Sequence, residues 1–279
     1  MRLSTKKLVY SALFAAVSFV LTALVHFPIF PAANWLEFNL GDMPLVFSAV
    51  VFGPWYGLAV TAVACVLQGI MLSAQSGFIG IIMHFFSTGA FVLCTGLILK
   101  NKSKNLRVAG ALICGAITQI LVMIPLNLTI SPAFLNGNRI AAQDISAVLK
   151  CFVTLPDNKY AAVCGAAFAA AFIVAFAIAL VYTVERSGRK DMAGIKGTVC
   201  GVISGIIYGF MVMFAMNVIF SNVEFSAMAS LIKDMMFTVY VPFNAIKAVS
   251  CAIVAYILYI AVGRYIRLML NTTKNDKNK

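Results

Sequence analysis

The chain has 279 residues, of which 62% are hydrophobic and 11% charged, with a formal net charge of +12 and a mean hydropathy of +0.97. Soluble domains carry about 25% charged residues, and a single soluble core stops growing at roughly 250–300 residues. The composition therefore excludes a soluble enzyme, a disordered chain and a disulfide-rich secreted domain, and it indicates a polytopic membrane protein.

Hydrophobic segments suited to membrane helices follow one another along the chain, since about 20 apolar residues cross a hydrocarbon core about 30 Å thick. In chain order they are Leu8–Phe27, Met43–Phe52, Tyr56–Leu72, Phe78–Leu99, Val108–Ile130, Ala161–Val184, Gly197–Phe220 and Val239–Val262. The short second segment ends at a Gly53-Pro54 turn. The first has a basic start but no cleavage site, so we expect a retained helix. The sequence predicts an all-α polytopic protein with about eight transmembrane helices in one membrane domain, 1–279.

The basic residues are distributed unevenly between the predicted loops. Most of the 21 lysines and arginines lie in four segments, 2–7, 100–107, 186–196 and 264–279. Positive charge concentrates on the cytoplasmic side of membrane proteins, so both termini are predicted to be cytoplasmic. The net charge therefore reports orientation in the cell membrane, and we expect no nucleic-acid partner.

Motifs for catalysis or metal binding are absent from the sequence. The seven cysteines form no Cys-x-x-Cys pair, and the two histidines, His26 and His84, are far apart in the chain. The sequence also lacks a Gly-x-x-x-x-Gly-Lys-Ser/Thr phosphate loop, a Gly-x-Ser-x-Gly elbow and a His-Glu-x-x-His pair. We therefore expect no metal, no cofactor and no enzymatic activity.

An internal repeat is visible in the second half of the chain. Cys114–Thr118 resembles Cys200–Ser204, and the same shift places Pro156 on Pro242 and Asn158 on Asn244. We interpret this as a duplicated helical hairpin, 106–184 and 193–270. Chance similarity between two apolar helices is the alternative.

The last predicted helix opens with Pro242-Phe243-Asn244-Ala245-Ile246-Lys247. Asn244 and Lys247 are three residues apart and share one helical face. A charge within the membrane costs about 2.5–3.5 kcal/mol, and such residues usually face a polar cavity. Lys247 is therefore predicted to contact a ligand, with snorkelling to the outer interface as the alternative.

The first predicted outer loop contains three further candidate residues. Asp42 precedes Met43-Pro44 and is suited to an N-cap and first turn of the short second helix, so we expect a structural role. Phe38 and Asn39 are candidates for the mouth of a pocket. An interfacial aromatic belt explains Phe38 and the nearby Trp35 equally well.

The first predicted helix carries Ala12 and Ala16 four residues apart. Small residues at this spacing let another helix approach closely. Composition alone favours ordinary packing within the chain.

These motifs together resemble the substrate-binding S components of energy-coupling factor (ECF) transporters, most closely the riboflavin-specific branch. The resemblance rests on Ala12-x-x-x-Ala16, Leu36–Pro44, Phe52–Pro54 and Pro242–Lys247, and it covers about 5–130 and 195–268, with 131–194 extra. It implies a six-helix core that captures a vitamin from outside and joins a transmembrane coupling protein and two cytoplasmic ATPase subunits.

The resemblance also implies roles for individual residues. Ala12 and Ala16 would contact the coupling protein, and Asn244 and Lys247 would contact the riboflavin ring. An asparagine at the outer end of the preceding helix would belong to the same pocket. Asn127 and Asn217 both match it, and we favour Asn217 because it adjoins the intact final motif. Asn158, in the first copy, lacks the Asn-x-x-Lys spacing.

The sequence departs from the family pattern in two helices. The third helix has Leu67-Gln68 where relatives often carry Lys-Asn, and the fourth has Met83-His84-Phe85 where Asn-Phe is common. His84 is a further candidate substrate contact at this position. The departures put the particular vitamin in doubt and leave the transporter class intact.

Two classes of function remain after these observations. One is an S component for riboflavin or another vitamin, and the other is an autonomous secondary transporter. A coupled carrier usually has carboxylates within the membrane, whereas every acidic residue here is predicted in or beside a loop. This placement favours the S component.

Overall fold

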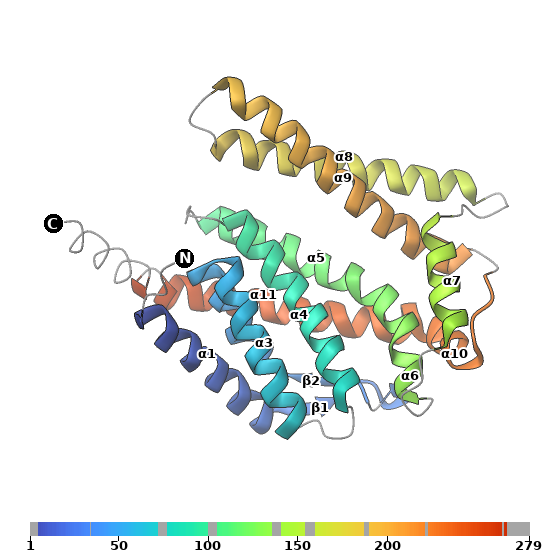
Figure 1. Cartoon of the computed structure of the whole chain (residues 1–279), viewed down its shortest axis with the longest axis horizontal. Helices are drawn as coiled ribbons and strands as arrows, with labels where there is room; N and C mark the ends of the chain where they lie inside the picture. Colours follow the sequence, from blue (N-terminus) through green and yellow to red (C-terminus); the bar gives the residue numbers. More distant parts are fainter. Residues whose placement is uncertain are drawn as a thin grey trace. The chain divides into compact units, whose positions relative to one another are not determined.

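The computed structural model describes residues 5–33, 35–71, 77–99, 105–135, 141–153, 160–186, 190–220, 223–263 and 265–266. It is mostly helical, and a helix forms in each of the eight predicted hydrophobic segments (Figure 1). In these ranges six helical stretches are long and apolar enough to cross a membrane. Two further apolar helices, Leu8–Leu24 and Asp42–Phe52, are shorter. The predicted helical fold class is thus confirmed, while the eight membrane spans and the cytoplasmic termini stay predictions.

The helices group into two compact units, the first formed by 1–126 and 235–279 and the second by 127–234. The N-terminal part of the first unit contains α1 (Thr5–Leu24), β1 (His26–Pro28), a 3-10 turn (Pro31–Ala33), β2 (Glu37–Asn39), α2 (Asp42–Phe52), α3 (Pro54–Met71), α4 (Gly77–Leu99) and most of α5 (Asn105–Thr129). Its C-terminal part contains a π-helical turn (Met236–Tyr240), α11 (Val241–Leu258) and a second π-helical turn (Tyr259–Gly263). The second unit contains α6 (Ser131–Leu135), α7 (Ala142–Val153), α8 (Ala161–Arg186), α9 (Lys190–Phe220) and most of α10 (Ala227–Met235).

Within the second unit, α9 packs on α8. The single membrane domain 1–279 and the duplicated hairpins 106–184 and 193–270 stay predictions. Among the described residues, the α-helices α1–α5 and α11 belong wholly or mostly to the first unit, and α8 and α9 belong to the second. The repeat itself stays a prediction, and its residues Pro156 and Asn158 lie outside the described ranges.

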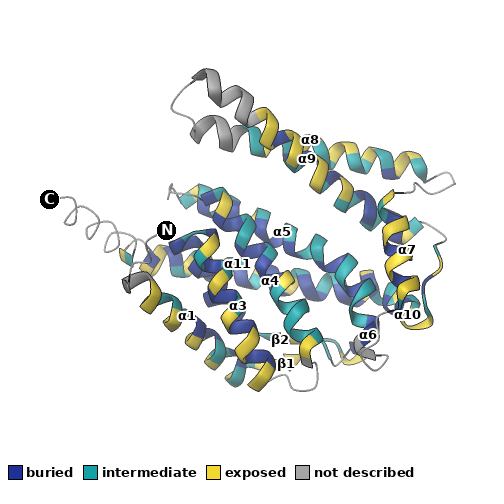
Figure 2. Cartoon of the chain, viewed as in Figure 1, coloured by how far each residue is buried: buried dark blue, intermediate teal, exposed yellow. Residues whose placement is uncertain are grey.

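The short helix α2 lies at the centre of the first unit. All of its 11 residues are buried, and it packs against α1, α3, α4 and α11. The neighbouring helices α1 and α3 carry exposed residues, drawn in yellow in Figure 2. A helix that is apolar around its whole circumference is buried on every side, which explains why Met43–Phe52 has no polar face. The aromatic rings of Phe47, Phe91 and Tyr259 belong to the core around it.

The predicted turn between the second and third helices is confirmed. Gly53 has φ +95°, a left-handed conformation that favours glycine, and its N–H donates to the Ala49 carbonyl (3.0 Å). Pro54 then begins α3, where its missing N–H has no cost. Against this turn, a Cβ at Gly96 of α4 would lie 2.6 Å from Pro54 Cα. The absence of a side chain at Gly96 thus lets α4 approach the start of α3.

The loop between α1 and α2 forms a short antiparallel hairpin that the sequence analysis did not predict. β1 pairs with β2 in the register His26–Asn39, Phe27–Phe38 and Pro28–Glu37. The hairpin holds the chain that leads into α2, and thereby fixes where α2 begins.

In the second unit, α8 and α9 pack through a ladder of phenylalanines and glycines. Gly201, Gly205 and Gly209 of α9 lie against the rings of Phe176, Phe172 and Phe168 of α8, respectively. A Cβ at each glycine would lie 2.8 Å from its ring. Helices pack closely in membranes through such small residues, so this spacing stabilises the hairpin.

Candidate substrate-binding site

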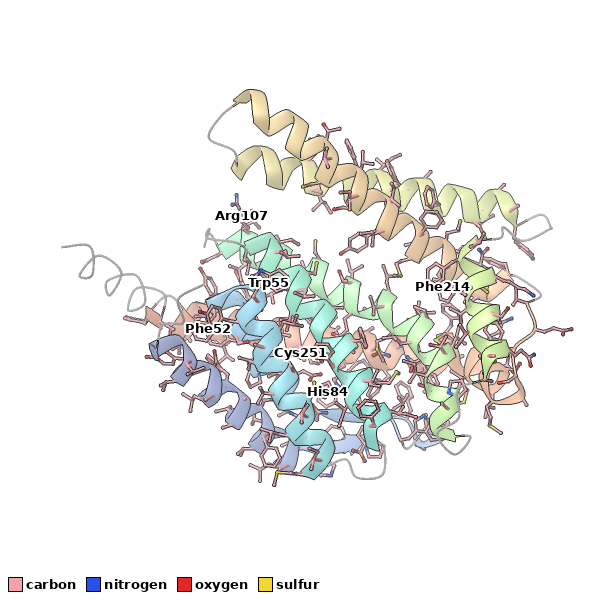
Figure 3. The ribbon with its side chains drawn as sticks, in the orientation of Figure 1. Phe52, Trp55, His84, Arg107, Phe214 and Cys251 are labelled. Atoms are coloured by element: carbon pink, nitrogen blue, oxygen red, sulfur yellow. The ribbon has the colours of Figure 1, made fainter. Side chains whose placement is uncertain are left out.

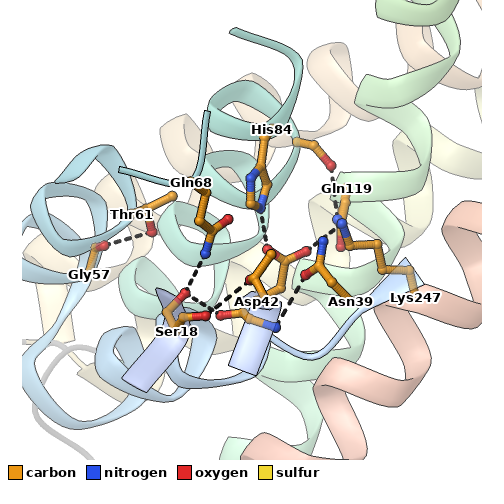
Figure 4. A network of polar contacts seen from close by, with 12 residues as sticks. Ser18, Asn39, Asp42, Gly57, Thr61, Gln68, His84, Gln119 and Lys247 are labelled. Carbon is orange, nitrogen blue, oxygen red and sulfur yellow. Dashed lines mark hydrogen bonds and ion pairs between the residues drawn. The ribbon is translucent and has the colours of Figure 1, made fainter. Parts of the chain in front are cut away.

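A buried ion-pair cluster lies where α2 begins in the first unit. The Asp42 carboxylate is 1% exposed; its Oδ1 contacts His84 Nε2 from α4, and its Oδ2 lies 2.8 Å from Lys247 Nζ of α11 (Figure 4). Three helices therefore converge on one carboxylate. Buried charges in proteins are usually paired, and this cluster supplies the partner that Lys247 needs in an apolar bundle.

The structure gives Lys247 a partner within the chain, and its predicted contact with a ligand stays a prediction. Lys247 is 9% exposed and its ammonium points to Asp42, so it does not extend toward an interface. An ammonium group has three donors, and among the described residues Asp42 is its one ion-pair partner. The remaining donors are suited to acceptors of a bound molecule. Cys251, one turn further along α11, is also buried in this unit (Figure 3).

The predicted N-cap role of Asp42 is wrong. Gly41 occupies the cap position and no side chain caps α2; Asp42 lies in the first turn with its carboxylate turned to His84 and Lys247. The sequence places Asp42 beside a loop, but its side chain is buried in the structure. An acidic residue beside a loop is therefore part of the interior charge cluster.

Two candidate asparagines, Asn244 and Asn39, lie a few residues along the chain from Lys247 and Asp42, respectively. Asn244 is 3% exposed and its Nδ2 donates to the Tyr240 carbonyl (2.8 Å) in the π-helical turn before α11. Asn39 Oδ1 accepts the Gly41 N–H (3.2 Å), which orders the backbone just before Asp42. Pro242 has no N–H to continue an α-helical ladder, consistent with the irregular turn that precedes α11.

Two aromatic residues of the loop between α1 and α2, Trp35 and Phe38, are half-buried and buried, respectively. Phe38 is 8% exposed, belongs to the core and packs on Phe27 with ring centroids 5.6 Å apart. Trp35 Nε1 donates to the Tyr240 hydroxyl (3.1 Å), joining the loop to the turn before α11. Phe38 therefore helps to fix the loop, and its role at a pocket mouth stays a prediction.

Gln119 on α5 is a polar residue that the sequence analysis did not select. It is 1% exposed and its Nε2 donates to Ser87 Oγ (2.9 Å), while its Oε1 is buried and has no partner among the described residues. Ser87 follows His84 by three residues on α4, so both lie on one face of that helix. Figure 4 draws Gln119 beside the cluster. A free buried acceptor of this kind is suited to a ligand N–H or O–H.

The other two candidate asparagines belong to the second unit and have partners there. Asn217 of α9 is fully buried, and its Nδ2 donates to the Cys151 carbonyl of α7 (2.7 Å). Nearby, Phe214 stacks on Phe152 with centroids 4.2 Å apart. Asn127 Oδ1 accepts from Ser131 Oγ (2.9 Å). Both asparagines thus stabilise local helix contacts, and their part in a pocket stays a prediction.

The two alanines selected for partner docking lie on the outer side of α1. Ala12 and Ala16 are exposed, whereas Ala15 is 4% exposed and packs in the core with Leu45 and Ala64. The face of α1 that carries Ala12 and Ala16 is thus open within the first unit.

The pairing of Lys247 with Asp42 is the feature that sequence reasoning missed. A signal for it was present, because a lysine inside an apolar helix requires an anion and few acidic residues are available. The pairing was not predicted because Asp42 lies beside a loop in the sequence. Its burial follows from the central position of α2, which only the structure shows. In the described residues, no group of three or more His, Cys, Asp or Glu could hold a metal ion.

Six long apolar helices and a charge cluster among core helices define a multi-pass membrane protein with a polar interior site. The model of the family described as "ECF transporter, substrate-specific component" matches residues 6–166. The chain therefore belongs to this family of S components, and it is a multi-pass protein of the cell membrane.

Known relatives of the chain are riboflavin transporters rather than enzymes. The riboflavin transporter FmnP of Bacillus subtilis is 29% identical over 134 residues, which cover 47% of this chain and 70% of that protein. The riboflavin transporter RibU of Streptococcus thermophilus is 28% identical over 125 residues, 44% of this chain and 59% of that protein. RibU of Staphylococcus aureus is 29% identical over 122 residues, 44% and 63% respectively. The chain thus spans about 60–70% of these relatives' lengths.

A solved structure titled "Structure and mechanism of the S component of a bacterial ECF transporter" is also similar. The two chains align over 76% of this chain and 92% of the solved one, with 19% sequence identity and a TM-score of 0.39. The family match ends before α11, so the roles of Asn244 and Lys247 rest on the Pro242–Lys247 motif.

Proposed function

We propose that this chain is the substrate-capture subunit of an ECF transporter and that its substrate is riboflavin. The observation that carries the proposal is the buried Lys247 ammonium, held by Asp42 in a chain of the S-component family. The riboflavin-transporter relatives support the choice of vitamin. Partner subunits would supply the energy, since the sequence has no phosphate loop of its own.

The substrate would bind at the end of the first unit that is predicted to face outside. The flavin ring has carbonyl oxygens and ring nitrogens that accept hydrogen bonds from Lys247 and from an asparagine amide. His84, Asn39 and Phe38 come from the elements around Asp42 and would complete the pocket. We retain Asn217 and Asn127 as candidate contacts from the sequence resemblance.

Lys247→Met tests the proposed contact directly. A hydrogen bond to a charged group contributes about 1.5–3 kcal/mol, so the variant should bind riboflavin about 10- to 150-fold more weakly. Sequence reasoning alone predicts easier membrane insertion for this variant, but the structure shows that it also removes a partner of Asp42. We therefore pair it with Asp42→Asn/Lys247→Met, which leaves no buried carboxylate behind.

The double variant separates ligand contact from folding. If the ammonium contacts riboflavin, the affinity loss persists in Asp42→Asn/Lys247→Met, measured by quenching of flavin fluorescence. Parent-like affinity in both variants would remove Lys247 from the pocket.

An autonomous secondary transporter is the second candidate function. The Asp42–His84–Lys247 cluster favours it, because buried titratable groups are what proton-coupled carriers use. Uptake into liposomes distinguishes the two. The S-component proposal expects riboflavin uptake only with the coupling protein, both ATPases and ATP, whereas uptake by the chain alone under an ion gradient would show a carrier.

A further inference from the structure

Three buried polar side chains lie between α1, α3 and the loop that enters α2, apart from the proposed ligand contacts. Ser18, Thr22 and Gln68 are 0%, 6% and 2% exposed in mostly apolar helices. Figure 4 draws Ser18 and Gln68 close together. Buried polar groups in a membrane bundle are usually paired and functional. A group of buried polar side chains at one place therefore calls for a role of its own.

The hydrogen bonds in this cluster run in one direction. Gln68 Nε2 donates to Ser18 Oγ (2.9 Å), and Ser18 Oγ donates to the Gly41 carbonyl (2.6 Å). A serine hydroxyl has one proton, so accepting from Gln68 leaves that proton for Gly41. Bonds in such a chain strengthen one another in a low-dielectric interior. The pair therefore fixes the Gly41 carbonyl to α1 and α3.

Gly41 fits against α1 and α3 because it has no side chain. A Cβ there would lie 1.9 Å from Thr22 Oγ1 and 2.8 Å from the Ser18 carbonyl oxygen. The Gly41 N–H is held as well, by Asn39 Oδ1 at 3.2 Å. Both backbone polar groups of Gly41 are thus restrained immediately before Asp42.

The next residue, Asp42, carries the carboxylate that contacts His84 and lies 2.8 Å from Lys247 Nζ. Binding groups work when neighbouring residues hold them within about 0.5 Å of the productive geometry. We propose that Ser18 and Gln68 are positioning residues that hold Gly41, and through it Asp42, so that the Lys247 ammonium is oriented for the substrate. This inference rests on the proposed function of riboflavin capture.

A double-mutant cycle separates positioning from a general effect on the fold. The interaction energy between coupled neighbouring residues corresponds to about a 2- to 150-fold change in affinity. Within this range, we expect Ser18→Ala and Gln68→Met each to weaken riboflavin binding about tenfold. In the Lys247→Met background the same substitutions should change affinity less than about twofold. Equal losses in both backgrounds, or none in the parent, would overturn the inference.

Two variants on α1 provide matched controls for Ser18→Ala. Ser18→Thr keeps the hydroxyl and should bind riboflavin with the affinity of the parent protein. Ser11→Ala makes the same substitution on the same helix, at a hydroxyl that has no partner among the described residues, and should leave affinity unchanged. A loss in Ser11→Ala as large as in Ser18→Ala would also contradict the assignment.

A readout without ligand keeps this inference separate from the proposed substrate. The chain has two histidines, so ¹⁵N-histidine labelling gives two imidazole environments. Ser18→Ala and Gln68→Met should shift the His84 resonances, because Asp42 moves, and Ser11→Ala should not. Unshifted His84 signals would refute positioning even if riboflavin binds. Shifted signals in a protein that fails to bind riboflavin would refute the substrate alone.

Discussion

Replacing Asp42 by asparagine should destabilise the protein strongly while changing little of its shape. Asp42 is 1% exposed and pairs with Lys247, which is itself 9% exposed. Removing one partner of a buried ion pair costs about 3–5 kcal/mol, because the remaining charge is left uncompensated. We therefore expect Asp42→Asn to lower the free energy of unfolding by that amount, measured by denaturant titration in mixed micelles.

Glu37→Gln is the matched control for this substitution. Glu37 lies in β2 of the same loop and is exposed, so the equivalent loss of charge should change the free energy of unfolding by less than about 0.5 kcal/mol. Asp42→Asn/Lys247→Met should recover part of the loss, since neither charge is left unpaired. Equal stabilities of Asp42→Asn and Glu37→Gln would refute the buried ion pair.

Three further predictions concern other parts of the chain. Ala12→Trp and Ala16→Trp should abolish riboflavin uptake by cells and leave the riboflavin Kd unchanged, because the bulk blocks a partner helix on an exposed face; retained uptake would exclude docking there. Gly205→Leu should destabilise the α8–α9 hairpin by about 1–3 kcal/mol in micelle unfolding, because its Cβ meets the Phe172 ring. Gly165→Leu, where nothing lies within 4 Å, should not. The preference for Asn217 predicts a larger loss of riboflavin affinity in Asn217→Ala than in Asn127→Ala, and the reverse order would favour Asn127.

The helical segments of the chain are predictable from the sequence because membrane spans depend on length and apolar composition. Gly53-Pro54 likewise predicts its turn, since glycine conformation and the proline ring act locally. The short hairpin His26–Asn39 was not predictable in this way. Three-residue strands carry too little periodicity to be recognised in the sequence.

The candidate site was predicted only in part, for a different physical reason. Lys247 stands out because a charge in an apolar helix is costly. Its partner Asp42 is far away in the sequence, and its burial follows from the central position of α2. Ser18, Gln68 and Gln119 are ordinary polar residues in apolar segments until the packing shows that their hydrogen bonds meet one another. Placement of α9 also depends on tertiary packing, because its composition resembles that of a core helix.

The most direct test of the account is an equilibrium titration of the purified chain with riboflavin, followed by quenching of flavin fluorescence. The account predicts saturable binding with one riboflavin per chain, in detergent and without ATPase partners. If the folded parent protein does not bind riboflavin in this titration, whether or not it binds another vitamin, riboflavin capture is contradicted.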